Sequence, residues 1–225
     1  MAKILGISGS PRKSSTEYAL NKALEEADRL PGIDTEMWSV RGKEIKFCTH
    51  CDYCVKNKDM CFINDDVNDL IDKMLKADGF IIASPVYDMN ISAQLAACFN
   101  RTRPLFIVKP GVFANKVGGA ISLGGTRHGG QETTIQSIIE FYLMNGILVT
   151  GGVGGCYSGG TVWTRDNEKE GVKNDLTGLN TVRGLGRAVA EASIITTEGK
   201  KNFGLLKKQN KIPEFTFVQD HELFE

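Results

Sequence analysis

Short apolar runs alternate with segments of helical periodicity along most of this chain, and this alternation restricts the possible folds more than any other feature. Five runs are typical of strands, at residues 3–8, 34–40, 79–84, 117–123 and 147–150. The run at residues 79–84 is apolar throughout, as expected of a parallel strand that is buried on both faces. Helical patterns begin near Ser14 and Asp65 and cover residues 92–101, 131–144 and 177–196. Five strands that alternate with five helices predict a doubly wound α/β fold.

The predicted sheet is parallel and five-stranded, with the flavodoxin-like order 2-1-3-4-5. This order places a ligand crevice at the carboxyl ends of strands 1 and 3. We expect residues 1–198 to form the domain, with a cysteine-rich loop at 47–62 after strand 2. Residues 199–225 form a C-terminal extension whose apolar side chains need the domain or a neighbouring subunit to cover them. Residues 151–174 are glycine-rich and polar and are expected to be a long loop around Trp163.

The charge of the chain narrows the range of partners. Its 225 residues include 27 Lys and Arg and 27 Asp and Glu, so the formal net charge is zero. This balance argues against a nucleic-acid-binding protein or a protein that binds membrane surfaces. We find neither a secretory leader nor a run of the roughly 20 apolar residues that cross a bilayer. A cytoplasmic protein is therefore expected.

The loop after strand 1 has the composition of a phosphate site. Its sequence, Ser8-Gly9-Ser10-Pro11-Arg12-Lys13-Ser14-Ser15-Thr16, leads into a helix. The free amides at a helix start bind anions, and Ser10, Ser15, Thr16 and Arg12 add hydroxyls and a guanidinium. Ser14 and Glu17 have the spacing of a capping box, so a helix cap without a ligand is the alternative.

Two further loops converge on the predicted crevice. Residues 84–90, Ser-Pro-Val-Tyr-Asp-Met-Asn, follow strand 3 and supply an aromatic and apolar wall. Residues 124–132, Gly-Gly-Thr-Arg-His-Gly-Gly-Gln-Glu, follow strand 4 and supply backbone amides and a cation. Taken alone, Tyr87 is better explained as a core or turn aromatic, and the glycines as a plain turn. Together they suit a flat, electron-rich heterocycle with a phosphate.

These three motifs, in this order over residues 3–150, resemble the NADPH-dependent FMN reductase superfamily. The match lies in Gly9-Ser10-Pro11-Arg12, Ser84-Pro85-Val86-Tyr87 and Gly129-Gly130-Gln131-Glu132. The resemblance implies a non-covalent FMN near a subunit interface. It assigns the phosphate to Ser10, Arg12, Ser15 and Thr16. It assigns the flavin ring to Pro85, Val86, Tyr87, Asp88, Met89, Asn90, Thr126, Arg127, Gly129 and Gly130. We further expect Arg127 to stabilise negative charge on the reduced ring.

Four cysteines fall within one short segment. Cys48, Cys51 and Cys54 are spaced two residues apart, and Cys61 follows after six more. A chain without an export signal uses such a cluster for metal rather than for disulfides. Zinc is the alternative, but three evenly spaced cysteines favour an iron–sulfur cluster. Cys98 and Cys156 stand apart and are expected to be buried.

Together with the flavin motifs, these four cysteines resemble the iron–sulfur flavoproteins, a branch of the same superfamily. The resemblance implies a 4Fe–4S cluster, FMN and a homodimer or homotetramer. We expect the cysteine loop to lie at the same sheet edge as the flavin crevice. We therefore predict an oxidoreductase that passes electrons between a one-electron donor such as ferredoxin and an acceptor through FMN. The alternatives are an NAD(P)H-dependent FMN or quinone reductase with structural zinc, a pure electron carrier or sensor, and a nucleotide-binding module without redox chemistry.

Overall fold

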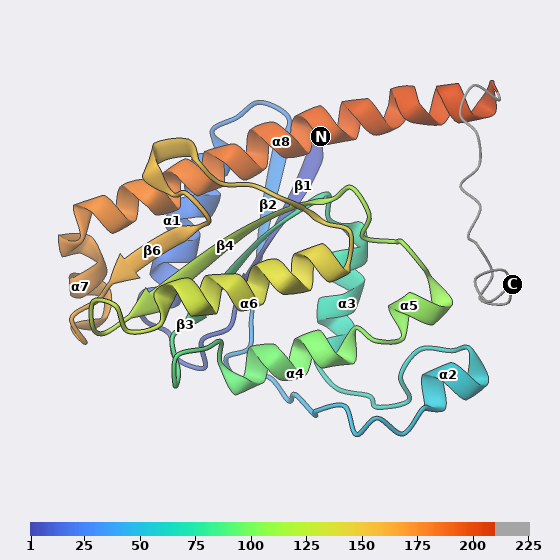
Figure 1. Cartoon of the computed structure of the whole chain (residues 1–225), viewed down its shortest axis with the longest axis horizontal. Helices are drawn as coiled ribbons and strands as arrows, with labels where there is room; N and C mark the ends of the chain where they lie inside the picture. Colours follow the sequence, from blue (N-terminus) through green and yellow to red (C-terminus); the bar gives the residue numbers. More distant parts are fainter. Residues whose placement is uncertain (210–225) are drawn as a thin grey trace, which may run out of the picture.

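A parallel sheet forms the centre of the molecule (Figure 1). The computed structural model describes residues 1–209, apart from the side chains of Val153 and of residues 206–208. Five strands pair in the order β2-β1-β3-β4-β5. They are β1 (Ala2–Ser8), β2 (Ile33–Ser39), β3 (Gly79–Pro85), β4 (Val117–Gly124) and β5 (Leu148–Val149). The predicted fold class and strand order are confirmed.

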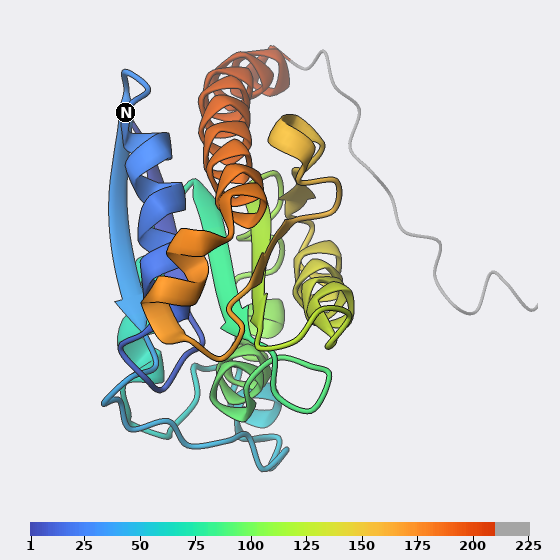
Figure 2. The same ribbon diagram turned by 90° about the vertical axis from the view of Figure 1, so that its left-hand side faces the viewer.

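Helices cover both faces of the sheet (Figure 2). On one face, α1 (Ser15–Asp28) packs against α8 (Leu176–Lys208), and both contribute to one apolar core. On the other face, α3 (Val67–Lys76), α4 (Ala93–Arg101) and α6 (Gln131–Met144) enclose a second core. Every residue of β3 and β4 is buried, because each strand has layers on both sides. This burial explains the continuous apolar runs in the sequence.

The fifth position of the sheet is shared by two short strands. β5 pairs with residues 117–118 of β4, and β6 (Gly160–Trp163) pairs in parallel with residues 121–124. A short 3-10 turn, Val153–Gly155, lies between them, and α7 (Glu168–Asn174) follows β6. The expectation that residues 151–174 form one irregular loop is therefore wrong. The carboxyl end of β4, with which β5 does not pair, supplies a backbone partner that the glycine-rich sequence does not reveal.

The N-terminus of α1 has no capping box. Ser14 is the N-cap residue, but its side chain accepts no hydrogen bond from the helix, and its backbone angles (φ −145°, ψ −134°) are unusual for a cap. The Glu17 carboxylate instead accepts hydrogen bonds from Ser39 Oγ (2.8 Å) and Arg41 Nε (3.0 Å) at the end of β2. The capping-box prediction is wrong, because Glu17 bonds instead to side chains at the end of β2 and just beyond it. The first amides of α1 consequently lack a side-chain partner.

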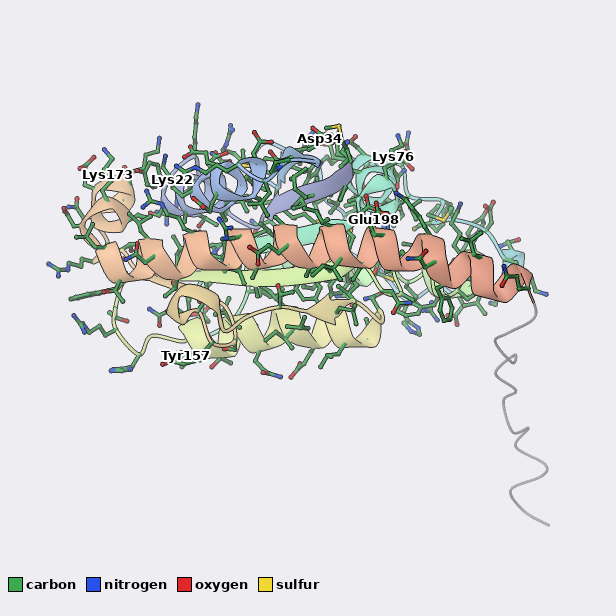
Figure 3. The ribbon with its side chains drawn as sticks, turned by 90° about the horizontal axis from the view of Figure 1, so that it is seen from above. Lys22, Asp34, Lys76, Tyr157, Lys173 and Glu198 are labelled. Atoms are coloured by element: carbon green, nitrogen blue, oxygen red, sulfur yellow. The ribbon has the colours of Figure 1, made fainter. Side chains whose placement is uncertain are left out.

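Helix α8 is longer than predicted. It begins at Leu176 and continues without interruption to Lys208, across the predicted boundary at residues 198 and 199. Figure 3, which looks down on α8, shows the helix continuing well past Glu198. Ile212, Phe215, Phe217, Val218 and Phe224 of the predicted extension lie outside the described residues. Among the described helices, none combines the length and apolar character that crossing a bilayer requires.

Buried Lys116 closes the C-terminal end of α3. Its Nζ donates hydrogen bonds to the carbonyls of Met74 (2.9 Å), Leu75 (2.9 Å) and Ala77 (2.6 Å). Replacing Lys116 with methionine should lower the free energy of unfolding by ~2–4 kcal/mol, because buried carbonyls lose a charged donor. Urea unfolding measures this loss. Lys201→Met, which removes only an exposed pair with Glu198, is the matched substitution and should leave stability unchanged.

Candidate functional site

The loops after β1 and β3 meet at the carboxyl edge of the sheet. Gly9 N donates to the Ala83 carbonyl (2.7 Å) at the end of β3. Ser92, the N-cap of α4, donates from its Oγ to the Gly9 carbonyl (2.6 Å) and accepts from Leu95 N. These bonds hold the start of α4 against the loop that leads into α1. The loops after β1 and β3 are therefore joined at the edge of the sheet where the crevice is predicted.

The predicted phosphate residues lie together on the β1–α1 loop. Ser10 is buried, and its Oγ donates to the Arg12 carbonyl (3.0 Å) and accepts from Arg12 N (3.2 Å). Thr16 is buried in the first turn of α1, while Ser15 is half-buried and Arg12 is exposed. Because no side chain caps α1, its amides are available to an anion beside these hydroxyls. The loop fits a phosphate by its donors, and the individual assignments stay predictions.

The β3–α4 loop forms a tight turn. Tyr87 and Asn90 exchange two backbone hydrogen bonds of 2.9 Å across Asp88 and Met89. Both central residues have positive φ, 46° and 65°, as in a type I′ turn. Such a backbone is strained for non-glycine residues and is found where the chain must present particular atoms. Pro85 is buried, Val86 and Tyr87 are half-buried, and Asp88, Met89 and Asn90 are exposed.

The β4–α6 loop touches this turn through Gly130. A Cβ atom at Gly130 would lie 2.7 Å from Met89 Cα and 3.1 Å from Val86 Cγ1, and Gly130 has a φ of +103°. Gln131 organises the rest of the loop, donating to the Thr126 carbonyl and accepting from Gly129 N (2.9 Å). Thr126 and Arg127 are exposed and Gly129 is half-buried. The structure thus brings all three predicted flavin loops to one edge.

Trp163 supports the β4–α6 loop, a role that the sequence pattern does not indicate. Its Nε1 donates to the Gly125 carbonyl (2.9 Å). The guanidinium carbons of Arg127 and Arg165 lie 4.3 Å and 4.2 Å from its ring centroid. Arg127 therefore stacks on Trp163 and, with it, lines a cavity of about 310 Å³ beside α6 and α8. The short run Thr161-Val162-Trp163 has the β-branched and aromatic residues typical of a strand, and this signal could have identified Trp163 as part of the sheet.

Replacing Trp163 with phenylalanine should weaken FMN binding by roughly tenfold. The substitution removes the donor to Gly125, and a neutral hydrogen bond contributes ~1 kcal/mol, close to a factor of ten. Fluorescence titration of the apoprotein with FMN measures the effect. The control is Trp38→Phe. Trp38 lies on β2, away from the β4–α6 loop, and its indole donates a comparable hydrogen bond to Asp69 in α3, so its loss should leave FMN affinity unchanged. Equal losses in both variants would remove the proposed role of Trp163.

The four clustered cysteines converge on one small cavity. Cys48, Cys51, Cys54 and Cys61 all line a space of about 20 Å³, together with residues at the end of α4. They form no disulfide; Cys54 is buried, Cys48 and Cys61 are half-buried, and Cys51 is exposed. Within residues 1–209, no three metal-ligating side chains stand close enough together to hold an ion. By its chemistry the thiol set suits iron or zinc, and binding either would require the loop to draw the sulfur atoms closer together.

The cysteine loop lies farther from the flavin loops than expected. It follows β2 as predicted and contains α2 (Tyr53–Asn57), but its cavity is lined by Asn100 and Arg101 at the end of α4. The other end of α4, at Ser92, contacts Gly9. Nine residues of helix are roughly 14 Å long. Figure 1 shows α2 and α5 (Leu105–Val108) at the far end of α4 from the β3–α4 loop.

Two charged side chains flank the cysteines. Arg103 donates to Asp52 Oδ1 (2.7 Å), and this hydrogen bond lowers the pKa of Asp52 and raises that of Arg103. The charges of Cys48 and Cys54 add to the raised pKa of Arg103, so its guanidinium lies within electrostatic range of both sulfurs. His50 has a 74% exposed side chain and does not line the cysteine cavity, as expected of a solvated loop residue.

Comparison with known proteins identifies the family of this chain. Residues 2–155 match the family model described as NADPH-dependent FMN reductase. An iron-sulfur flavoprotein of Archaeoglobus fulgidus is 44% identical over 189 residues, which cover 84% of this chain and 95% of that protein. An iron-sulfur flavoprotein of Methanocaldococcus jannaschii is 41% identical over 182 residues, 80% of this chain and 91% of that protein.

Solved structures share the fold at low identity. The crystal structure of RosB, with a bound 8-demethyl-8-formylriboflavin-5'-phosphate intermediate, superposes with a TM-score of 0.68 at 15% identity. The superposition covers 97% of this chain and 91% of RosB. This likeness supports the flavodoxin-like architecture of the sheet and its helices.

Proposed function

This chain belongs to the NADPH-dependent FMN reductase family and is a flavin-dependent oxidoreductase, and from this premise we propose that it carries both FMN and a 4Fe–4S cluster. In this proposal it passes electrons between a one-electron donor such as ferredoxin and an acceptor through FMN. The observation that carries the proposal is the convergence of Cys48, Cys51, Cys54 and Cys61 on one cavity. FMN, when bound, supplies both one-electron and hydride chemistry.

The proposed flavin site uses the three loops at the sheet edge. The uncapped start of α1 and the hydroxyls of Ser10 and Thr16 would hold the phosphate. The Tyr87–Asn90 turn and the amides near Gly129 would line the ring. The hydrogen bonds of Gln131 and Trp163 fix the second loop before the ligand arrives. Such preorganisation lowers the entropic cost of binding.

The proposed cluster site uses a loop whose base is held by α3 and α4. Four thiolates from one loop satisfy the usual ligand requirement of a 4Fe–4S cluster. Arg103, paired with Asp52, would partly balance the negative charge of the loaded site. We also propose a cytoplasmic location, because a chain that uses a cysteine cluster to bind metal needs a reducing compartment. We also propose a homodimer or homotetramer, with NAD(P)H as the other possible redox partner and neither nucleic acid nor a membrane as a partner.

Anaerobic stopped-flow spectroscopy tests the proposed electron route. Reduced ferredoxin should reduce the flavin of the wild-type protein, and a Cys61→Ser variant that retains FMN should lose this reaction. Reduction by NADPH serves as the internal comparison, because it does not require the cysteine loop. Fast flavin reduction by NADPH alone, with no effect of Cys61→Ser, would instead support an NAD(P)H-dependent FMN or quinone reductase with structural zinc. A quinone-reducing relative from Cupriavidus metallidurans, 33% identical over 144 residues, favours this as the second candidate.

A further inference from the structure

A buried arginine closes the base of the cysteine loop. Arg101, the last residue of α4, has a fully buried side chain. Its Nη1 donates to the Lys46 carbonyl (3.0 Å) and to Asp65 Oδ2 (2.7 Å). Its Nη2 donates to the Ile63 carbonyl (3.0 Å) and Asn68 Oδ1 (3.4 Å). One guanidinium thus joins the chain just before Cys48 to the chain just after Cys61.

Asp65 also joins the two ends of the cysteine loop, and we call the Arg101–Asp65 pair with its hydrogen bonds the clasp. Its side chain is also fully buried, and its Oδ2 accepts from Lys46 N (2.8 Å) as well as from Arg101. Its Oδ1 accepts from Val67 N (3.1 Å) at the start of α3. A buried ion pair offsets its desolvation only when the remaining hydrogen-bonding groups are satisfied. Here both carboxylate oxygens and both terminal guanidinium nitrogens have partners.

One donor of the clasp has no partner. Arg101 Nε is buried and makes no hydrogen bond, although the other two guanidinium nitrogens make four. Arg101 also lines the cavity on which the four cysteines converge. A buried donor without a partner is costly, most of all when it belongs to a charged group, so Arg101 Nε calls for an acceptor. Sulfur atoms of a thiolate-ligated cluster are acceptors of the required kind.

We propose that Arg101 is a positioning residue for the cluster: its terminal nitrogens hold the two ends of the cysteine loop, and its Nε donates a hydrogen bond to a cluster or cysteinyl sulfur. This inference rests on the proposed 4Fe–4S site. A hydrogen bond to sulfur stabilises the more negative, reduced cluster and therefore raises its reduction potential. Arg103 differs, because its guanidinium is half-exposed and bonded to Asp52.

Pulsed electron–nuclear double resonance on the full-length, cluster-loaded protein tests the hydrogen bond directly. The protein is labelled with ¹⁵N-arginine and reduced to the paramagnetic state. We expect one ¹⁵N nucleus and one exchangeable proton coupled to the cluster. Both signals should disappear in Arg101→Lys and persist in Arg103→Lys, the same substitution at the other arginine that lines the cavity. If Arg101→Lys fails to fold, the Arg103→Lys spectrum decides, because a coupling that persists there cannot come from Arg103.

The reduction potential provides the second measurement. Arg101→Lys should shift the reduction equilibrium of the cluster roughly tenfold toward the oxidised state, about 59 mV more negative for one electron. Asp65→Asn, which loosens the clasp but keeps Nε, should lower cluster retention without that shift. A cluster signal without ¹⁵N coupling in the wild type, or equal potentials in Arg101→Lys and Arg103→Lys, would overturn the inference. Absence of any iron–sulfur signal would instead refute the proposed function.

Discussion

A Gly130→Ala variant is expected to lose tight FMN binding. The added Cβ would lie 2.7 Å from Met89 Cα, a backbone atom that cannot rotate away. The loops after β3 and β4 would have to separate, and these loops form the proposed ring site. We expect FMN affinity to fall roughly 100-fold or more, which corresponds to about 3 kcal/mol of binding free energy. Titration of the apoprotein with FMN, followed by flavin fluorescence, measures the loss.

Gly32→Ala separates this effect from simple backbone strain. Gly32 also has a positive φ, +89°, but a Cβ atom added there would have no other atom within 4 Å, and the residue is remote from the flavin loops. Its alanine variant should lose ~1–2 kcal/mol of stability from the left-handed backbone and retain wild-type FMN affinity. If Gly130→Ala and Gly32→Ala bound FMN equally well, the contact between the two loops would have no part in the site.

A Cys54→Ala variant is expected to lose the iron of the protein while it keeps FMN. Cys54 is the buried member of the four cysteines, so its sulfur has the least freedom to be replaced by solvent. Three remaining thiolates leave one corner of a cubane cluster without its protein ligand. The iron content measured after anaerobic gel filtration should fall from about four atoms per chain to about one or fewer. Because α4 separates the two sites, flavin content should change little.

Cys98→Ala is the matched cysteine substitution. Cys98 lies on α4 and is buried, and burial raises the pKa of its thiol to about 12, so the thiolate needed for ligation is disfavoured. Cys98→Ala should therefore keep a full complement of iron and lose only a small amount of stability. Equal iron loss in both variants would indicate that folding, rather than ligation, controls iron content.

The sequence predicts the sheet well because the strands that matter most are buried on both faces. β3 and β4 are nearly continuous apolar runs, and this pattern identifies them without knowledge of the tertiary structure. β6 was missed because its pairing depends on the free end of β4, not on its own four residues. The capping box was predicted wrongly for a similar reason. Glu17 interacts with Ser39 and Arg41, which are distant in sequence.

The sequence predicts which segments make up the candidate site better than it predicts how those segments are placed relative to one another. The cysteine spacing and the three loops are local patterns, and strand order predicts the meeting of the three loops better than the position of the cysteine loop. The position of the cysteine loop depends on Arg101 and Asp65, which are 36 residues apart and form no recognisable motif. Likewise, Trp163 contacts Gly125 across 38 residues. Such long-range hydrogen bonds are set by packing, which periodicity does not encode.

The quantification of flavin, iron, acid-labile sulfide and zinc in protein purified without oxygen tests the central claim most directly. The two-centre account predicts one FMN, about four irons and about four sulfides per chain, with an absorbance shoulder that bleaches on reduction. One FMN with stoichiometric zinc and no iron would contradict it. The flavin loops at the sheet edge would then remain as described, and the cysteine loop would be a structural zinc site.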